Sequence, residues 1–99
     1  MRNFVYKLRI IVDRALYEPY LPAHLAYLAE LDAAGVLVLS GPFADRTGGL
    51  IIVRAPSLEA ARAIAEADPL VLNEVDSYEL HEWTITAGDP ARIATLMHS

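Results

Sequence analysis

Two side chains suited to proton transfer, His24 and Asp68, lie at the ends of predicted helices. His24 falls early in a helix predicted over residues 20–34, and Asp68 directly follows a helix predicted over residues 57–67. An imidazole oriented by a carboxylate is a competent general base or acid near neutral pH. Because both helices are expected on the same side of one sheet, we predict that His24 and Asp68 form a catalytic pair.

Both residues also have a structural interpretation. His24 fits a partly exposed position at the edge of the apolar stripe of its helix. Asp68 precedes Pro69, and Asp-Pro is a common helix start in which the Asp caps the first turn. The same dipeptide occurs again at Asp89-Pro90. The residues alone therefore leave both a catalytic and a structural role open.

A second set of polar positions is predicted to bind a small anionic organic ligand. Lys7 and Arg9 interrupt one face of the first predicted strand, and His81 lies in the last. The full predicted set is Ser40, Gly41, Pro42, Lys7, Arg9 and His81. Ordinary cross-strand ion pairs involving Glu79 explain the charged members equally well, so this alternative also remains open.

Several other chemistries have no support in the residues. The chain contains no cysteine, which excludes disulfides, thiolate metal sites and cysteine nucleophiles. No histidines show the spacing of a helical zinc site, and Ser40 lacks the flanking glycines of a nucleophile elbow. Gly48-Gly49 has no phosphate-loop continuation and is predicted to form a turn. We therefore predict neither a metal nor a cofactor.

The hydrophobic pattern alternates between strand and helix periods along the chain. It predicts strands over 4–12, 36–39, 50–54 and 77–86, helices over 20–34, 57–67 and 69–74, and a helical tail. The order is βαββαβ, which indicates an α+β, ferredoxin-like fold: a four-stranded antiparallel sheet with two helices on one face. We expect one domain over residues 1–99, with a core over 1–86 and a C-terminal helical tail over 87–99.

Composition sets the broad class of protein. The 99 residues are 55% hydrophobic and carry a net charge of −5, which favours a compact domain and argues against nucleic-acid binding. Arg2, Lys7 and Arg9 break the N-terminal apolar stretch, so no signal peptide or membrane span is predicted there. A cytoplasmic protein without membrane association is expected.

The open face of the predicted sheet requires a cover. By strand alternation this face presents Val5, Ile11, Trp83 and Ile85, and such a patch is larger than a monomer usually exposes. We therefore predict a homodimer in which two sheets pack face to face.

The sequence resembles the YCII family of small bacterial proteins over nearly its whole length. The resemblance is carried, in order, by Pro22 to Leu28, Gly35, Ser40 to Pro42, Ser57 to Ala61 and Ala67 to Pro69. It implies a dimeric α+β barrel and a His-Asp site formed by His24 and Asp68 in a cleft near Gly41-Pro42. Leu21, Leu70 and Glu74 depart from the residues that the family often has at those positions.

Together these features predict a small enzyme that acts on a carbonyl- or lactone-containing organic acid. Its chemistry would be general acid/base catalysis leading to isomerisation or elimination. His24 would move the proton, and Asp68 would orient the His24 imidazole. The alternative is a dimeric module that binds a small ligand or supports a partner without catalysis. A cofactor-free monooxygenase or haem-handling barrel would share the fold, but the sequence contains no motif that distinguishes either.

Overall fold

The computed structural model describes residues 1–97 and confirms the predicted α+β fold. The strands are β1 (Arg2–Ile10), β2 (Leu37–Pro42), β3 (Gly48–Ala55) and β4 (Asp76–Glu82). The helices are α1 (Arg14–Tyr17), a 3-10 turn η1 (Glu18–Tyr20), α2 (Leu21–Ala33), α3 (Leu58–Ala67), α4 (Pro69–Leu72) and α5 (Pro90–Met97).

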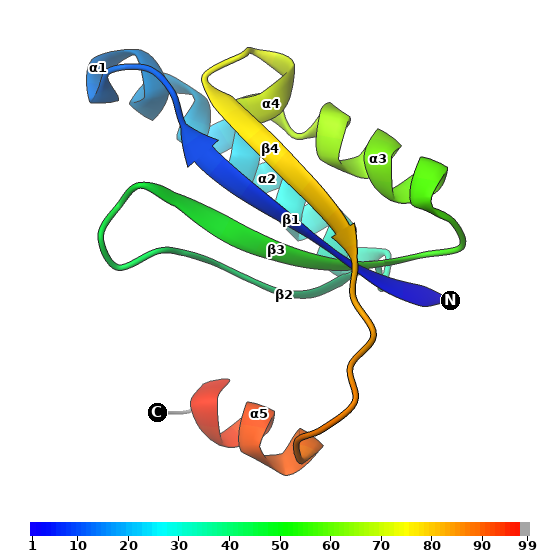
Figure 1. Ribbon diagram of the computed structural model, residues 1–99. Coiled ribbons are helices and arrows are strands. Elements are labelled where there is room, and N and C mark those ends of the chain that lie inside the picture. The colour runs from blue at the N-terminus through cyan, green and yellow to red at the C-terminus, as the bar shows by residue number, and fades with distance from the viewer. Residues whose placement is uncertain (98–99) are drawn as a thin grey trace.

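The four strands form one antiparallel sheet in the order β2-β3-β1-β4. Helices α2 and α3 lie side by side across one face of this sheet, and α5 lies on the opposite side (Figure 1). This is the ferredoxin-like arrangement expected from the βαββαβ order. Within residues 1–97, the helices are all too short or too polar to cross a lipid bilayer.

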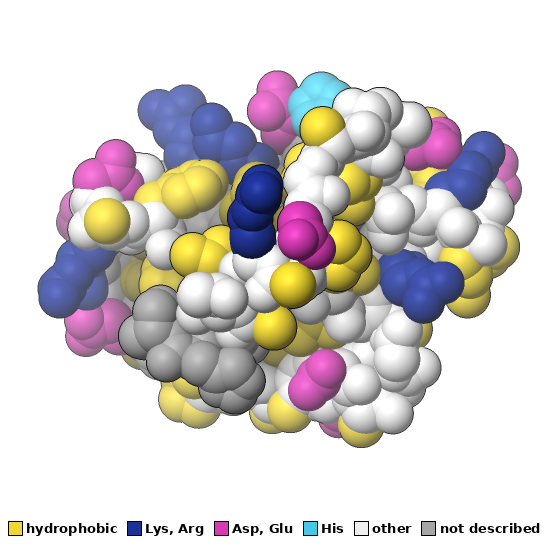
Figure 2. All heavy atoms as spheres, turned by 90° about the horizontal axis from the view of Figure 1, so that it is seen from below, with side chains coloured by type: hydrophobic (Ala, Val, Ile, Leu, Met, Phe, Trp, Pro, Cys, Tyr) yellow, Lys and Arg dark blue, Asp and Glu magenta, His cyan; other side chains and the backbone are white. Residues whose placement is uncertain are grey.

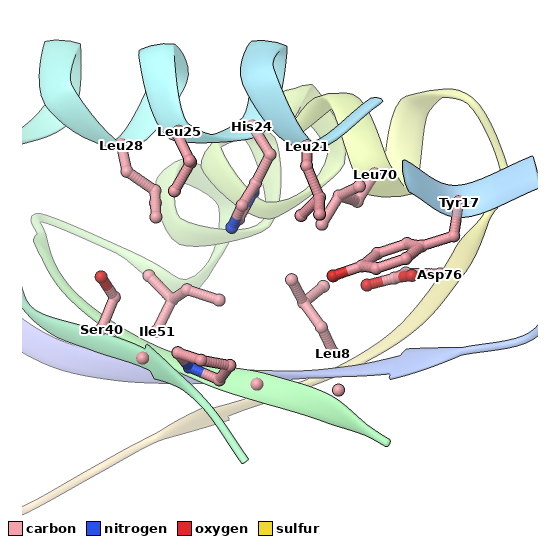
Figure 3. Close-up of a pocket in the computed structure, with 14 residues that line it drawn as sticks. Leu8, Tyr17, Leu21, His24, Leu25, Leu28, Ser40, Ile51, Leu70 and Asp76 are labelled. Carbon is pink, nitrogen blue, oxygen red and sulfur yellow. The ribbon is translucent and has the colours of Figure 1, made fainter. Parts of the chain in front are cut away.

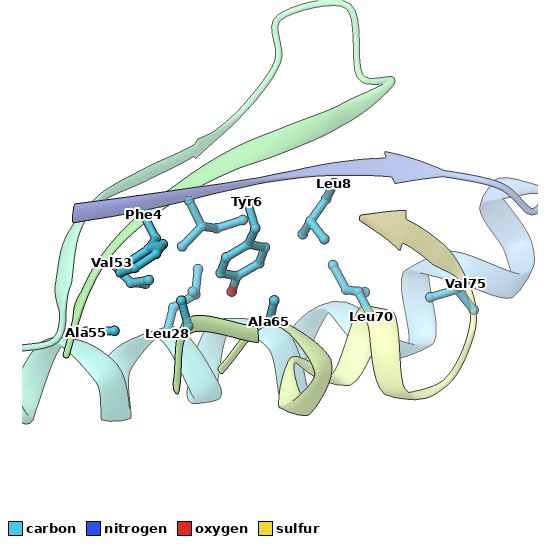
Figure 4. Close-up of a cluster of buried hydrophobic side chains, with 11 residues drawn as sticks. Phe4, Tyr6, Leu8, Leu28, Val53, Ala55, Ala65, Leu70 and Val75 are labelled. Carbon is cyan, nitrogen blue, oxygen red and sulfur yellow. The ribbon is translucent and has the colours of Figure 1, made fainter. Parts of the chain in front are cut away.

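The core lies between the sheet and the helices, as the alternation in β1 predicts. Figure 4 shows Phe4, Tyr6 and Leu8 between the sheet and the helices, where they are buried. Lys7 and Arg9, which alternate with them, are exposed. Each large apolar side chain buried in this way contributes about 1.5 to 3 kcal/mol of transfer free energy. The alternation of β1 therefore fixes which face of the sheet carries the helices.

The limits of α3 follow from its sequence. The Ser57 hydroxyl oxygen accepts a hydrogen bond of 3.1 Å from the backbone amide of Ala60, so Ser57 is the N-cap of α3, as predicted. At the other end, Pro69 disfavours the helical conformation for the residue before it, and Asp68 is indeed extended, with φ −60° and ψ 126°. Helix α4 then starts at Pro69 and ends at Leu72, two residues earlier than predicted. Glu74, predicted to be the last residue of this helix, instead has a positive φ of 58°.

The prediction that Gly48-Gly49 forms a turn is wrong, because both glycines belong to β3. The connection is the shorter segment 43–47, and Ser40 to Pro42 extend β2 rather than leaving it. A Cβ atom on Gly48 would lie 1.8 Å from the carbonyl oxygen of Leu8. Glycine is thus required here by the close contact between β1 and β3. In the sequence alone, such a glycine cannot be told apart from one that marks a turn.

The predicted strand over 77–86 is also too long. Strand β4 ends at Glu82, and the amide of Trp83 makes one further bond, 2.8 Å to the carbonyl oxygen of Asn3. Beyond this point β1 continues to Arg2 paired with β3 alone. Trp83 and Ile85 therefore lie beyond the sheet, as does Ile11 after the end of β1, although all three are exposed as expected.

The predicted C-terminal helical tail contains α5, which lies below β2 in Figure 1. Viewed from that side, hydrophobic side chains are interspersed with charged ones (Figure 2). A shallow hollow there is lined by Leu39, Ser40, Gly41, Leu50, Ile52, Ile93 and Leu96. The part of the predicted tail that includes His98 lies outside the described residues.

Candidate functional site

His24 and Asp68 are brought together by the packing of α2 against the junction between α3 and α4. The Nδ1 atom of His24 lies 2.8 Å from Oδ1 of Asp68, across 44 positions of sequence. The His24 side chain is buried apart from about a tenth of its surface, and that of Asp68 is fully buried. The contact is therefore a buried hydrogen bond shielded from competing water.

Asp68 also accepts hydrogen bonds from two other groups. The Tyr6 hydroxyl donates to Oδ2 at 2.9 Å, and the backbone amide of Leu70 donates to Oδ1 at 3.0 Å. Burial, and then the charge of Asp68, raise the pKa of the Tyr6 phenol far above its usual value, so the hydroxyl keeps its proton and donates it. Asp68 is thus the cap of α4 and the partner of His24 at the same time.

A pocket of about 220 Å³ lies between α2 and the sheet, and His24 forms part of its wall. Figure 3 shows the imidazole pointing from α2 toward the sheet, between Leu21 and Leu25. The remaining lining residues come from the four strands and from α1, α2 and α4: Leu8, Tyr17, Leu28, Ser40, Gly41, Pro42, Gly48, Gly49, Ile51, Leu70 and Asp76. The wall is mainly apolar, with few polar groups, as is typical of a small-molecule site.

Three of the six predicted ligand-binding residues, Ser40, Gly41 and Pro42, line this pocket. Lys7, Arg9 and His81 do not, because strand alternation places them on the opposite face of the sheet. On that face, His81 Nε2 lies 3.6 Å from Glu79 Oε2, an exposed contact within β4 and not the cross-strand pair that was expected. A ligand role for Lys7 and His81 stays a prediction for a surface separate from His24. A ligand role for Arg9 also stays a prediction, and Arg9 lines a further hollow with Arg14, Tyr17 and Arg46.

The sequence did not indicate Asp76, which is the first residue of β4 and lines the pocket. Its side chain faces the same side of the sheet as Tyr78 and Leu80, and only 4% of its surface is exposed. Its buried Oδ1 atom has no hydrogen-bond partner among the described residues. Burial, and then the nearby charge of Asp68, raise the pKa of Asp76 to about 6, although His24 acts in the opposite direction. An acidic residue on the inward register of β4 was the available signal.

Two arginines near the pocket were also missed. Arg14 and Arg46 line a hollow that shares Tyr17, Leu21 and Pro42 with the pocket. The Nη1 atom of Arg14 lies 3.4 Å from Oε1 of Glu18 in an exposed ion pair. Arg14 belongs to α1, a helix absent from the predicted elements, and Arg46 lies in the connection between β2 and β3. The pocket therefore opens beside positive charge.

The described residues contain no group of three or more His, Asp or Glu side chains arranged to hold a metal ion. The polar atoms of the site instead form a connected set around Asp68, consisting of Tyr6, His24 and the amide of Leu70. Such an arrangement can hold one imidazole tautomer and move a proton.

Known structures share this fold. A 5-chloro-2-hydroxyhydroquinone dehydrochlorinase from Burkholderia phenoliruptrix AC1100, in complex with 2,5-dihydroxybenzoquinone, superposes with a TM-score of 0.73 at 22% identity, over 85% of this chain and 95% of that one. Muconolactone isomerase gives a TM-score of 0.69 at 16% identity, over 89% and 94%. The fold is that of the dimeric α+β barrel proteins.

Sequence comparison extends the likeness beyond the fold. An uncharacterized protein of Bacillus subtilis (strain 168), YjpA, is 37% identical over 68 residues, which are 69% of this chain and 80% of that protein. The model of the YCII-related domain matches residues 12–84, which include α2, β2 and the Asp68-Pro69 junction. The chain therefore belongs to the YCII-related domain family.

Proposed function

We propose that the protein is a small enzyme that removes and returns a proton next to a carbonyl group, with His24 as the general base and acid. The observation that carries this proposal is the 2.8 Å contact between His24 Nδ1 and Asp68 Oδ1 at the wall of a pocket. A buried imidazole with one nitrogen held by a carboxylate and its ring facing a cavity has the arrangement that general base catalysis needs.

The hydrogen bonds of Asp68 determine which nitrogen reacts. Asp68 receives donors from Tyr6 and from the Leu70 amide, so its oxygens act as acceptors, and His24 supplies a third donor from Nδ1–H. The lone pair of the neutral ring then lies on Nε2. When Nε2 takes a proton, the carboxylate of Asp68 stabilises the imidazolium that forms. Asp68 is therefore a positioning residue in this proposal.

The proposed substrate is a small organic acid that contains a ketone or lactone carbonyl. Six of the fourteen residues that line the pocket are leucine or isoleucine, and their side chains suit an apolar ring or chain. The acid group would lie in the adjoining hollow, where Arg14 and Arg46 provide the anion contacts first assigned to Lys7 and Arg9.

The names of the structural neighbours are consistent with this reaction class. One is named for dehydrochlorination and the other for isomerisation. Loss of HCl across a carbon–carbon bond and migration of a double bond in a lactone can both start when a base removes a proton activated by a carbonyl group. The likeness in fold supports the reaction class and leaves the substrate to experiment.

Turnover of small lactones and chlorinated hydroxyquinols, followed by absorbance and by chloride release, tests this proposal. His24→Gln and Asp68→Asn are expected to lower kcat by about 100-fold or more while the circular dichroism spectrum stays unchanged. If both variants kept full turnover of a substrate that the parent converts, the proposal would be rejected. Glu59→Gln is the control, because Glu59 is exposed in the first turn of α3 and lies outside both the pocket and the predicted ligand-binding set.

The second candidate is a ligand-binding or accessory module without catalysis. The amide of Leu70, 3.0 Å from Asp68 Oδ1, favours it, because this bond gives Asp68 a structural role as the cap of α4 that requires no catalysis. In that case Asp68→Asn, which can still cap, would preserve ligand binding, and no compound in the panel would be converted by the parent protein.

We also propose that the open face of the sheet is covered by a second copy of the chain. Leu50 and Val5 are only partly buried on this face, and Ile93 of α5 is 45% exposed. Apolar side chains gathered on one sheet face favour burial against a matching face. Light scattering at micromolar concentration is expected to give the mass of a dimer, and a monomer mass would count decisively against this assembly.

A further inference from the structure

Asp76 is a buried carboxyl group in the pocket that the proposed mechanism does not use. It is 96% buried, and its Oδ1 atom has no hydrogen-bond partner among the described residues. Buried polar atoms in proteins are nearly always hydrogen-bonded, so such an exception requires an explanation. Because Asp76 lines the pocket beside Tyr17, a ligand in that pocket is within its reach.

The surroundings of Asp76 favour the neutral carboxylic acid more strongly than those of an exposed aspartate do. The pocket lining contains no lysine or arginine that could compensate a charge. The charged and titratable groups that act on Asp76 are Asp68, from the junction of α3 and α4, and His24, from α2. Tyr17 faces it from α1, and Figure 3 shows the Tyr17 hydroxyl and the Asp76 carboxyl at the same end of the pocket.

The physical consequence is a proton that stays on Asp76 at higher pH than usual. Burial and the charge of Asp68 raise the pKa of Asp76 to about 6, with His24 opposing them. A carboxylic acid kept in its neutral form can donate a strong hydrogen bond to an oxygen on which negative charge develops.

We infer that Asp76, as a carboxylic acid, is a second catalytic residue of the pocket and hydrogen-bonds the carbonyl oxygen of an uncharged ketone or lactone group. This inference rests on the proposed function and specifies it further. The reacting part of the substrate is a neutral carbonyl group, and any acid group of the substrate lies outside the pocket toward Arg14 and Arg46.

The proton transfers balance with two protein groups. Nε2 of His24 removes a proton from the carbon next to the carbonyl, and that C–H electron pair forms a carbon–carbon double bond. The carbonyl π pair moves to oxygen, which takes the proton of Asp76, giving an enol, an imidazolium and a carboxylate. In an isomerisation the enol returns its proton to Asp76, and the imidazolium protonates the distant carbon. Both side chains then regain their starting states.

An ionised Asp76 would have the opposite preference. A carboxylate in this position would repel a carbonyl oxygen and would accept a hydrogen bond from a ligand hydroxyl instead. The two possibilities therefore differ in the sign of the pH dependence of ligand binding, which can be measured without any turnover.

The probe is 2(5H)-furanone, an uncharged unsaturated lactone with a single carbonyl group. Its dissociation constant is measured by NMR titration of the full-length protein between about pH 5 and pH 8. If only the acid form of Asp76 binds, affinity falls about tenfold for each pH unit above about 6. The side-chain carboxyl carbon of Asp76 is expected to titrate near pH 6 in the free protein, and at higher pH when the lactone is bound.

Three variants separate the role of Asp76 from that of the fold. Asp76→Asn keeps a donor that cannot ionise, so its binding is expected to be independent of pH and within about threefold of the parent at pH 5. Asp76→Leu loses the donor and is expected to bind about tenfold more weakly at pH 5. Glu79→Gln, an exposed carboxyl on the other face, is expected to behave like the parent.

Three results would overturn the inference: binding that strengthens as pH rises, an unchanged pH dependence in Asp76→Asn, or no furanone binding to the parent at pH 5. The outcome is separable from that of the proposed function. His24→Gln is expected to retain the pH-dependent binding of the lactone while losing turnover. A failure of the His24 assignment therefore leaves the Asp76 binding result intact. A failure of the Asp76 inference likewise leaves the turnover test of His24 intact.

Discussion

Tyr6 and Asp68 are joined by a hydrogen bond of 2.9 Å, and both side chains are completely buried. This bond connects the central strand β1 to the junction of α3 and α4. The same carboxylate holds His24 from α2. The imidazole is therefore positioned from the middle of the core, which keeps its orientation independent of the exposed residues at the pocket opening.

Tyr6→Phe tests this connection. Removing the hydroxyl leaves Oδ2 of Asp68 without its donor, and the expected loss in the free energy of unfolding is about 1.5 to 3 kcal/mol, measured by urea denaturation. Tyr27→Phe is the matched control, because the Tyr27 hydroxyl bonds a neutral carbonyl, that of Ile64, at 2.7 Å. Its expected cost is about 0.5 to 1.5 kcal/mol. Equal losses would show that the Asp68 carboxylate does not depend on Tyr6.

Asp68→Ala is expected to destabilise the protein more than the loss of a helix cap would. A lost cap costs about 0.5 to 2 kcal/mol, and the Tyr6 hydroxyl left buried without an acceptor adds about 1 to 3 kcal/mol. Ser57→Ala, which removes the cap of α3 without leaving a buried partner, provides the comparison. If the two variants melted at the same temperature, Asp68 would be no more than a cap.

Gly48→Ala is expected to lower the free energy of unfolding by about 3 kcal/mol or more, because the new Cβ would lie 1.8 Å from the Leu8 carbonyl oxygen. Gly41→Ala is the control within the same pocket, since a Cβ there meets no atom within 4 Å. Thermal denaturation of the two variants distinguishes them. Similar stability of both would contradict the close approach of β3 to β1.

The stability of the folded state is expected to decrease as pH rises through the titration range of Asp76. Its pKa is raised from 3.8 to about 6, so the folded state binds more protons than the unfolded state between these values. The contribution is fully present below about pH 4 and is lost above about pH 6, with a size of roughly 2 to 3 kcal/mol. Urea denaturation at several pH values measures it.

Asp76→Asn isolates this contribution, because the variant cannot ionise. Relative to the parent, the variant is expected to gain roughly 2 to 3 kcal/mol between pH 4 and pH 8. Asp45→Asn should show no such gain, since hydrogen bonds from Thr47 lower the pKa of the exposed Asp45. Parallel stability curves for the parent and Asp76→Asn would place the Asp76 pKa near its usual value.

The proposed dimer predicts that Val5→Asp converts the protein to a monomer. Val5 lies in the middle of β1 on the open face, where a carboxylate would be buried against the second copy without a partner. Leu72→Asp is the matched control, because Leu72 is 68% exposed on α4, on the helix side of the sheet. Light scattering is expected to report a monomer for the first variant and a dimer for the second.

Local patterns in the sequence were sufficient to predict the core of the fold. The alternation Phe4, Tyr6, Leu8 predicted the buried face of β1, and the Ser57 cap predicted the start of α3. The errors concern the conformation of Gly48 and the length of the last strand. Gly48 resembles a turn residue until β1 is placed against it, and the strand predicted over 77–86 ends at Glu82.

The candidate site shows the same division. His24 and Asp68 could be paired in advance, because each is a chemically distinctive residue at a helix end, and the family resemblance includes both. Asp76 and Arg14 were missed because both lie outside the elements predicted from the sequence. The position of Asp76 in the pocket depends on the inward register of β4. The position of Arg14 depends on a short helix, α1, that has no clear periodic signal in the sequence.

The sequence by itself determined the order of elements, the apolar face of each strand and the capacity of Asp68 to end one helix and start another, because these depend on neighbours a few residues away. Only the tertiary structure decided that Asp68 meets both Tyr6 and His24, and that Asp76 is enclosed in the pocket. Distance, burial and dielectric surroundings arise from packing between segments far apart in the chain. These quantities decide whether a carboxyl group caps a helix, orients a base or keeps its proton.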